Sequence, residues 1–170
     1  MDEIEVFSGK VKDLPGLWQR PRLLRPVSEI ELARIQQGLE IVLPDDVKAF
    51  LRRGLASIEG HLTEDPSASL GFDFLDPDGI VDSTTILRNV VDETLDDDDP
   101  HARVVRHGVA LTFCEPQLVV SKGAVYHFSF RNRICKVAKS FSAFLGDYLS
   151  SGCFVSGHFD ALWHVVGAHV

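Results

Sequence analysis

The side chains that offer the most chemistry lie in one acidic stretch, VDETLDDDDPH at residues 91–101. Six of its positions are carboxylates: Asp92, Glu93, Asp96, Asp97, Asp98 and Asp99. Clustered carboxylates attract basic proteins and can occupy a cleft that is built for phosphates. The stretch lacks the alternating ligands, the glycine and the distal glutamate of an EF-hand, so it does not predict a calcium site. It predicts a surface for a basic partner or, alternatively, a solvated polar loop.

A second acidic stretch, FDFLDPDGIVD, covers residues 72–82. Pro77-Asp78-Gly79 lies between apolar runs, and this composition predicts a turn. The aspartates of the stretch can also extend the acidic surface. We therefore expect Asp76 and Asp78, together with Glu64 and Asp65, to form a rim around it.

The other reactive residue types form no recognisable catalytic or metal-binding pattern. His158 and His164 are six residues apart, whereas three or four would place two ligands on one helix face. The sequence contains no G-x-S-x-G, no Gly-rich phosphate loop and no H-E-x-x-H. Cys114 and Cys135 lie in apolar runs, where thiols are usually buried and inert, and a Cys–His pair would arise only through tertiary contact. We predict no enzymatic activity, no metal and no cofactor.

Composition suits one globular domain in a reducing compartment. The chain has 170 residues, 45% hydrophobic and 25% charged, which is enough for a substantial core. The three cysteines form no C-x-x-C pair and do not predict a disulfide scaffold. The acidic N-terminus differs from a signal peptide, and no apolar run approaches the roughly 18 residues of a membrane helix. We expect a cytoplasmic protein without membrane contact.

The charge is unevenly distributed along the chain. Residues 1–100 contain 10 basic and 22 acidic side chains, a net of −12, whereas residues 101–170 contain 7 and 3, a net of +4. No basic stripe for nucleic acid is present, and an acidic surface repels phosphates. The pattern favours a protein partner over nucleic acid.

The elements that must position these side chains follow from periodicity and from turn signals. Ser28 and Glu31 form a capping box for a helix to about Gln37 or Glu40, and VLPDDVKAFLRRG at residues 42–54 predicts a second helix that ends at Gly54. A short helix is expected at 86–94 and another from Ser140, SFSAFLGDYLSS, to Gly152. Alternation predicts strands at 71–75, 80–85, 103–106, 109–113, 118–121, 125–130 and 134–138.

Helices followed by several antiparallel strands and a final helix indicate an α+β fold. We expect N-terminal helices and a C-terminal helix to pack on a mainly antiparallel sheet. Residues 28–152 form the domain in this interpretation. Residues 1–27 are an arm packed on it, and residues 153–170 are an extension that contains a short helix.

Two segments resemble the SUKH superfamily. The first is IVLPDDVKAFLRRG, preceded at the appropriate distance by SEIELARIQQGLE, and the second is VAKSFSAFLGDYL at residues 137–149. They cover about 40 of 170 residues. The Asn-Gly-Gly that often follows the first helix in the family is absent, and so is the middle acidic-Gly turn.

The resemblance implies a binding module without catalytic residues. Bacterial members resemble immunity proteins that neutralise a cognate polymorphic toxin, often a nuclease or deaminase, and fungal relatives resemble regulators of cell-wall synthesis. We therefore expect an immunity protein that binds a basic toxin and blocks its active cleft. The alternatives are a regulatory or scaffold module of the same fold and a small-molecule-binding protein. The sequence does not predict the oligomeric state.

Overall fold

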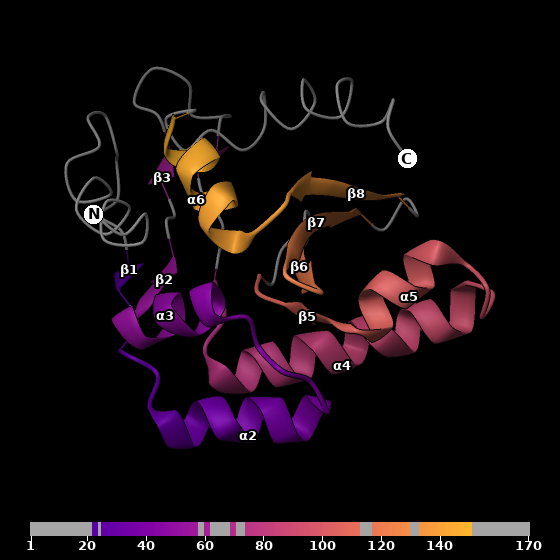
Figure 1. Cartoon of the computed structure of the whole chain (residues 1–170), viewed down its shortest axis with the longest axis horizontal. Helices are drawn as coiled ribbons and strands as arrows, with labels where there is room; N and C mark the ends of the chain where they lie inside the picture. Colours follow the sequence, from indigo (N-terminus) through magenta and orange to yellow (C-terminus); the bar gives the residue numbers. More distant parts are fainter. Residues whose placement is uncertain are drawn as a thin grey trace.

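The computed structural model describes residues 22–23, 25–57, 60–61, 69–70, 74–112, 117–129 and 133–150. Within these ranges the chain is α+β, as predicted, with five helices and one four-stranded antiparallel sheet (Figure 1). The helices are α2 (Glu29–Leu39), α3 (Asp45–Arg53), α4 (Pro77–Thr94), α5 (Pro100–Arg106) and α6 (Phe141–Ser150). The sheet contains β5 (Gly108–Ala110), β6 (Gln117–Ser121), β7 (Ala124–Ser129) and β8 (Arg133–Ala138). Shorter strands are β1 (Arg22–Leu23) paired with β2 (Leu55–Ser57), and β3 (Gly60–His61) paired with β4 (Ser69–Leu70).

The first two helices begin and end as the sequence predicts. At the start of α2, Glu31 N donates to Ser28 Oγ at 3.3 Å, and Ser28 N donates to Glu31 Oε2 at 2.9 Å, so the capping box is complete. Helix α3 follows Pro44, and Gly54 ends it in the left-handed conformation with φ 74°. Local capping chemistry therefore sets the start of α2 and the end of α3.

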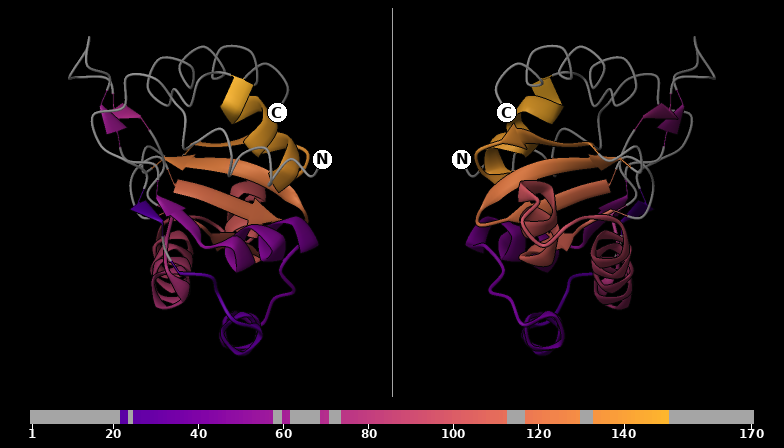
Figure 2. Two further views of the ribbon diagram at one scale, coloured as in Figure 1. Left: turned by 90° about the vertical axis from the view of Figure 1, so that its left-hand side faces the viewer. Right: turned by 90° about the vertical axis from the view of Figure 1, so that its right-hand side faces the viewer.

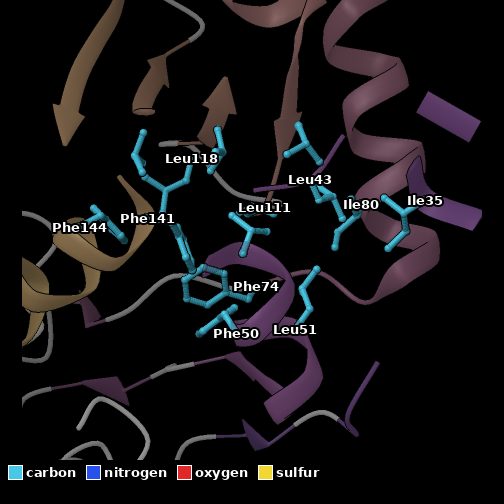
Figure 3. Packing of buried hydrophobic residues seen from close by; sticks show 14 of the residues in the cluster. Ile35, Leu43, Phe50, Leu51, Phe74, Ile80, Leu111, Leu118, Phe141 and Phe144 are labelled. Carbon is cyan, nitrogen blue, oxygen red and sulfur yellow. The ribbon is translucent and has the colours of Figure 1, made fainter. Parts of the chain in front are cut away.

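Helices α3 and α6 contact each other through the two segments that carry the SUKH resemblance. Ser142 N, in the first turn of α6, donates to Asp46 Oδ2 at 2.9 Å. The rings of Phe50 and Phe141 lie 5.1 Å apart in an edge-to-face arrangement, and Phe74 joins them at 4.8 Å from Phe50 (Figure 3). Asp46 thus caps a helix that begins almost a hundred residues later.

Three predictions for residues 76–94 are wrong, because these residues form α4 and its N-cap. The expected strand at 80–85 and the expected short helix at 86–94 are parts of one 18-residue helix. The expected turn at Pro77-Asp78-Gly79 is its first turn, because the Asp76 carboxylate accepts from Gly79 N at 2.7 Å. Buried Ile80, Leu87 and Val91 recur at helical spacing, which is incompatible with a strand.

The prediction of a strand at 103–106 is wrong, because these residues belong to α5. Asp99 and Pro100 repeat the arrangement seen at the start of α4: Asp99 Oδ1 accepts from His101 N at 2.7 Å, and Pro100 begins the helix. Ala102 and Val105 are buried, as expected for two residues three apart on one helix face.

The sheet is an antiparallel meander in the order β5-β6-β7-β8. Strands β6, β7 and β8 agree with the predictions at 118–121, 125–130 and 134–138, and Lys122-Gly123 joins the first two of them. The predicted strand at 109–113 is represented by β5 and by a bridge from Phe74 to Thr112. Of the strand predicted at 71–75, the structure describes only residues 74 and 75, and Phe74 takes part in this bridge. Residues 71–73 lie outside the described part.

Two hydrophobic clusters occupy the two faces of the sheet. Alternate residues of β6 enter different clusters: Leu118 and Val120 join one, and Val119 joins the other. The first cluster receives side chains from α2, α3, α6 and the start of α4. The second receives them from α5 and the rest of α4. Helix α4 therefore contributes to both sides.

Helix α4 also covers the free edge of the sheet, since β5 is an outer strand. Ala110 N donates to Thr84 Oγ1 at 2.9 Å, and Arg88 Nη2 donates to Gly108 O at 3.1 Å. Leu111 N donates to β6, so by alternation the amide of Ala110 points away from that strand. Polar side chains of α4 thus bind edge groups that would otherwise be open to strand pairing.

Arg88 joins three elements. Its Nη1 donates to Leu39 O, at the C-terminal end of α2, at 3.0 Å. Helices α2 and α4 lie side by side (Figures 1 and 2). Burial lowers the pKa of the Arg88 guanidinium below its usual range, although the group stays protonated.

Several predictions lie outside the described residues. They concern most of the N-terminal arm, the extension at 153–170 with His158, His164 and His169, and the residues Cys114 and Cys153. No helix among those that the structure describes is long and apolar enough to span a membrane.

Candidate functional site

The acidic segment, defined here as residues 92–99, lies where α4 passes into α5, at the right-hand end of the ribbon in Figure 1. Asp92 and Glu93 belong to the last turn of α4, and Asp96 to Asp99 belong to the connection that follows. All but Asp99, which is half-buried, have exposed side chains. The structure therefore brings the six predicted carboxylates together on one end of the molecule.

Arg106, in the last turn of α5, holds the acidic segment in place. Its Nε donates to Asp92 Oδ1 at 2.6 Å, and its Nη2 lies 2.8 Å from Asp97 Oδ1. Its Nη1 also donates to the Asp97 carbonyl oxygen at 3.4 Å. The hydrogen bond to Asp92, together with the charges of Asp92 and Asp97, raises the pKa of the Arg106 guanidinium. One side chain thus links the end of α4, the connection and α5.

The remaining carboxylates of the segment differ in how far they are engaged. Asp99 caps α5, and Asp98 lies 3.8 Å from Arg103, which is a weak exposed pair. Glu93 and Asp96 are exposed and form no ion pair within the described residues. Six carboxylates against the guanidinium groups of Arg103 and Arg106 leave a local net charge of −4.

Asp76 and Asp78, predicted as a rim of the same surface, lie at the opposite end of α4. Asp76 caps the helix, and Asp78 pairs with Arg34 of α2. Eighteen helical residues span about 27 Å, so these two carboxylates are separated from the acidic segment by the length of the helix. Both serve the local structure. Glu64 and Asp65 lie outside the described residues.

A cysteine and a histidine lie directly opposite each other on two neighbouring strands. Cys135 of β8 is in register with His127 of β7, and side chains of directly opposed residues share one face of a sheet. Both side chains are buried, with 7% of Cys135 and 4% of His127 exposed. A thiol in this position is shielded from a substrate, which agrees with a structural cysteine.

Metal binding has no visible support among the residues that the structure describes. No group of three or more His, Cys, Asp or Glu side chains converges there as ligands would. His101 is half-buried on α5, and His107 is exposed directly after it.

Arg103 and Arg106 are the residues of this site that sequence reasoning missed. Reading 103–106 as a strand would place successive side chains on opposite faces, whereas a helix places residues three apart side by side. The signal that could have found them is the Asp99-Pro100 pair, which marks a helix start.

Comparison with known proteins gives no assignment: no protein-family model matches this sequence, and none of the curated proteins does.

Proposed function

We propose that this chain is a non-catalytic protein-binding module that acts as an immunity protein. Its partner in this proposal is a basic polymorphic toxin, such as a nuclease or deaminase, whose active cleft it blocks. The proposal rests on the acidic segment and on the resemblance to SUKH proteins. The observation that carries it is the excess of carboxylates at the junction of α4 and α5, held in one arrangement by Arg106.

The excess charge matters because it acts before contact. A local charge of −4 attracts a basic cleft over roughly one Debye length, about 8–10 Å at physiological salt. Complementary charge of this kind raises association rates above the roughly 10⁵–10⁶ M⁻¹s⁻¹ of uncharged encounters. Carboxylates arranged along a fixed backbone can also occupy subsites that would otherwise receive substrate phosphates.

The contacts of Arg106 with Asp92 and Asp97 matter because ordering a flexible segment when it binds costs free energy. A flexible acidic loop would lose conformational freedom when it bound, and that loss would reduce affinity. Arg106 fixes the Asp92 and Asp97 ends of the segment in advance, while Glu93 and Asp96 stay unpaired within the described part. The arrangement keeps charge available without leaving the segment loose.

The test uses two variants that remove equal charge from opposite ends of α4. The first carries Asp96→Asn and Asp98→Asn. The matched control carries Asp76→Asn, which retains a capping side chain, and Asp78→Asn, which removes one exposed ion pair. Tagged wild type captures its partner from native cells. The captured protein is then purified, and its association rates with all three forms are measured at 50 mM and 500 mM salt.

We expect the first variant to associate several-fold more slowly at low salt, the difference to shrink at high salt, and the control to behave like wild type. Coexpression of wild type is expected to abolish the captured protein's toxicity in growing cells. A partner whose toxicity is unaffected would refute the immunity role. Equal rates for both variants would refute the acidic segment as the contact.

A further inference from the structure

One side of α4 carries an exposed apolar residue between acidic ones. Asp82, Ile86, Val90 and Glu93 follow each other at intervals of four, four and three residues, so they lie along one side of the helix, here called the α4 flank. Ile86 is 60% exposed, Val90 is half-buried, and both acids are exposed. The stripe runs for about 17 Å and joins the acidic segment at Glu93.

Other sides of α4 are occupied by the rest of the molecule. Leu87 and Val91 enter the second hydrophobic cluster. Val81 lies beside Gly38 of α2, and Arg88 reaches the end of the same helix. The positions of these contacts around the helix place the α4 flank on the side away from α2. Its exposure is therefore not a consequence of a loosely packed helix.

The acids of the α4 flank are unpaired, and this distinguishes Ile86 from the comparable Ile30 of α2. Ile30 is 82% exposed, but its neighbours Glu29 and Glu31 are neutralised by Arg52 and Arg25. Asp82 and Glu93 form no ion pair within the described residues. On the α4 flank an exposed apolar side chain therefore lies between uncompensated acids of the same helix side, which favours a cationic surface over a neutral one.

The acidic segment alone is too small for a stable complex. A standard interface needs about 800 Å² from each partner, and its centre is an apolar anchor surrounded by polar residues. The α4 flank adds the missing apolar element next to the charge. Ile86 has the position of an anchor, and Asp82, Glu93 and the acidic segment have that of the rim.

We infer that the α4 flank is the centre of a docking surface for a basic protein, which inserts Ile86 into an apolar pocket bordered by Lys and Arg side chains. This inference rests on the proposed function and names the surface by which the partner is bound. It predicts that affinity depends on Ile86 as well as on charge.

The test uses a probe of the stated chemistry, a fluorescent helical peptide of Leu and Lys residues, with a Leu/Glu peptide of the same length as its control. Its binding is measured by fluorescence anisotropy to wild type, Ile86→Asp and the matched Ile30→Asp. Folding of each variant is checked by far-UV circular dichroism. Ile86→Ala, which preserves helix propensity, serves as a milder second variant.

The Asp variant separates the two forces because they act in opposite directions. If charge alone held the peptide, Ile86→Asp would bind as tightly as wild type or more tightly, since it adds a negative charge. If Ile86 is the anchor, affinity falls about tenfold with Ile86→Asp and less with Ile86→Ala. Ile30→Asp is expected to change affinity less than about twofold.

Equal effects at positions 86 and 30, or no binding of the Leu/Lys peptide by wild type, would overturn the assignment of the α4 flank. Because this assay needs no toxin, such a failure leaves the immunity proposal to its own test. Conversely, a captured protein that proves harmless would refute immunity without affecting the dependence on Ile86.

Discussion

Replacing Arg88 with methionine tests how α4 is fixed to the rest of the molecule. The substitution retains most of the aliphatic stem but removes the guanidinium. Leu39 O, at the end of α2, and Gly108 O, on edge strand β5, then lose their donors at 3.0 and 3.1 Å. Both acceptors belong to positions with unpaired backbone groups, a helix end and a sheet edge.

The expected cost follows from these two bonds. A hydrogen bond with a charged partner contributes roughly 1.5–3 kcal/mol when it is buried. The site is only partly buried, so water can replace some of the lost bonding, and we expect Arg88→Met to reduce the free energy of unfolding by about 2–4 kcal/mol in total. Arg88→Lys retains the charge but lacks the two-pronged geometry, and we expect it to lose about half as much.

Urea denaturation followed by far-UV circular dichroism measures these differences, provided that the m-value is unchanged. Arg103→Met is the matched control, because its exposed pair with Asp98 at 3.8 Å should contribute less than about 0.5 kcal/mol. If Arg88→Met costs no more than Arg103→Met, then the bonds from Arg88 do not hold α4 against α2 and β5.

Two other changes have predictable signs. Gly108→Ala should lower the free energy of unfolding by about 1–3 kcal/mol, because its Cβ would lie 2.5 Å from Val119 Cγ1 and 2.7 Å from Val104 O. In Gly146→Ala of α6 the new Cβ meets no atom within 4 Å, so this variant should be slightly more stable than wild type. Thermal unfolding of both variants checks this, and a shift of the melting temperature in the same direction for both would contradict it. The Arg25 hydrogen bond, followed by those from Ser28, holds the pKa of Glu31 well below its usual value of 4.5. The stability that Glu31 contributes is therefore present above pH 4.5 and is lost as the pH falls below it. In urea titrations the difference in the free energy of unfolding between wild type and Glu31→Gln should become smaller from pH 7 to pH 3. A constant difference would refute this linkage.

The parts of the fold that sequence reasoning predicted are those specified by local chemistry. The capping box at Ser28 and Glu31 and the glycine at the end of α3 act within a few residues, so they are readable without knowledge of the tertiary structure. The same holds for β6 and β7, because the Lys122-Gly123 turn signal lies between two apolar runs and joins the two paired strands in the structure.

Helix α4 was misread because its buried side is partly polar. Ser83 and Thr84 are buried and bond to Gln117 and Ala110 of the sheet, while Ile86 is exposed. Polar residues inside and an apolar residue outside weaken the helical pattern, and the β-branched residues nearby favour a strand. Only the sheet edge explains why hydroxyl groups belong on that side of the helix.

The site was predicted in its charges but not in its geometry. Asp92 and Arg106 are fourteen positions apart, and their contact requires that α5 turn back against α4. Because residues 103–106 were predicted as a strand, the contact of Arg106 with Asp92 was not predicted. The acidic segment was found because a count of carboxylates does not depend on the fold.

A count of carboxylates nevertheless overstates how much negative charge a partner meets. The acids of α2 and of the starts of α3 and α4 are engaged by cations of the same half of the chain: Arg52 with Glu29, Arg25 with Glu31, Lys48 with Asp45, and Arg34 with Asp78. Between Asp92 and Asp99 the carboxylates outnumber the paired cations by four. Within the described residues, the acidic segment and the α4 flank are therefore places where exposed carboxylates exceed the cations that pair with them. For this reason the charge removed at Asp96 and Asp98 should slow association, and equal charge removed at Asp76 and Asp78 should not.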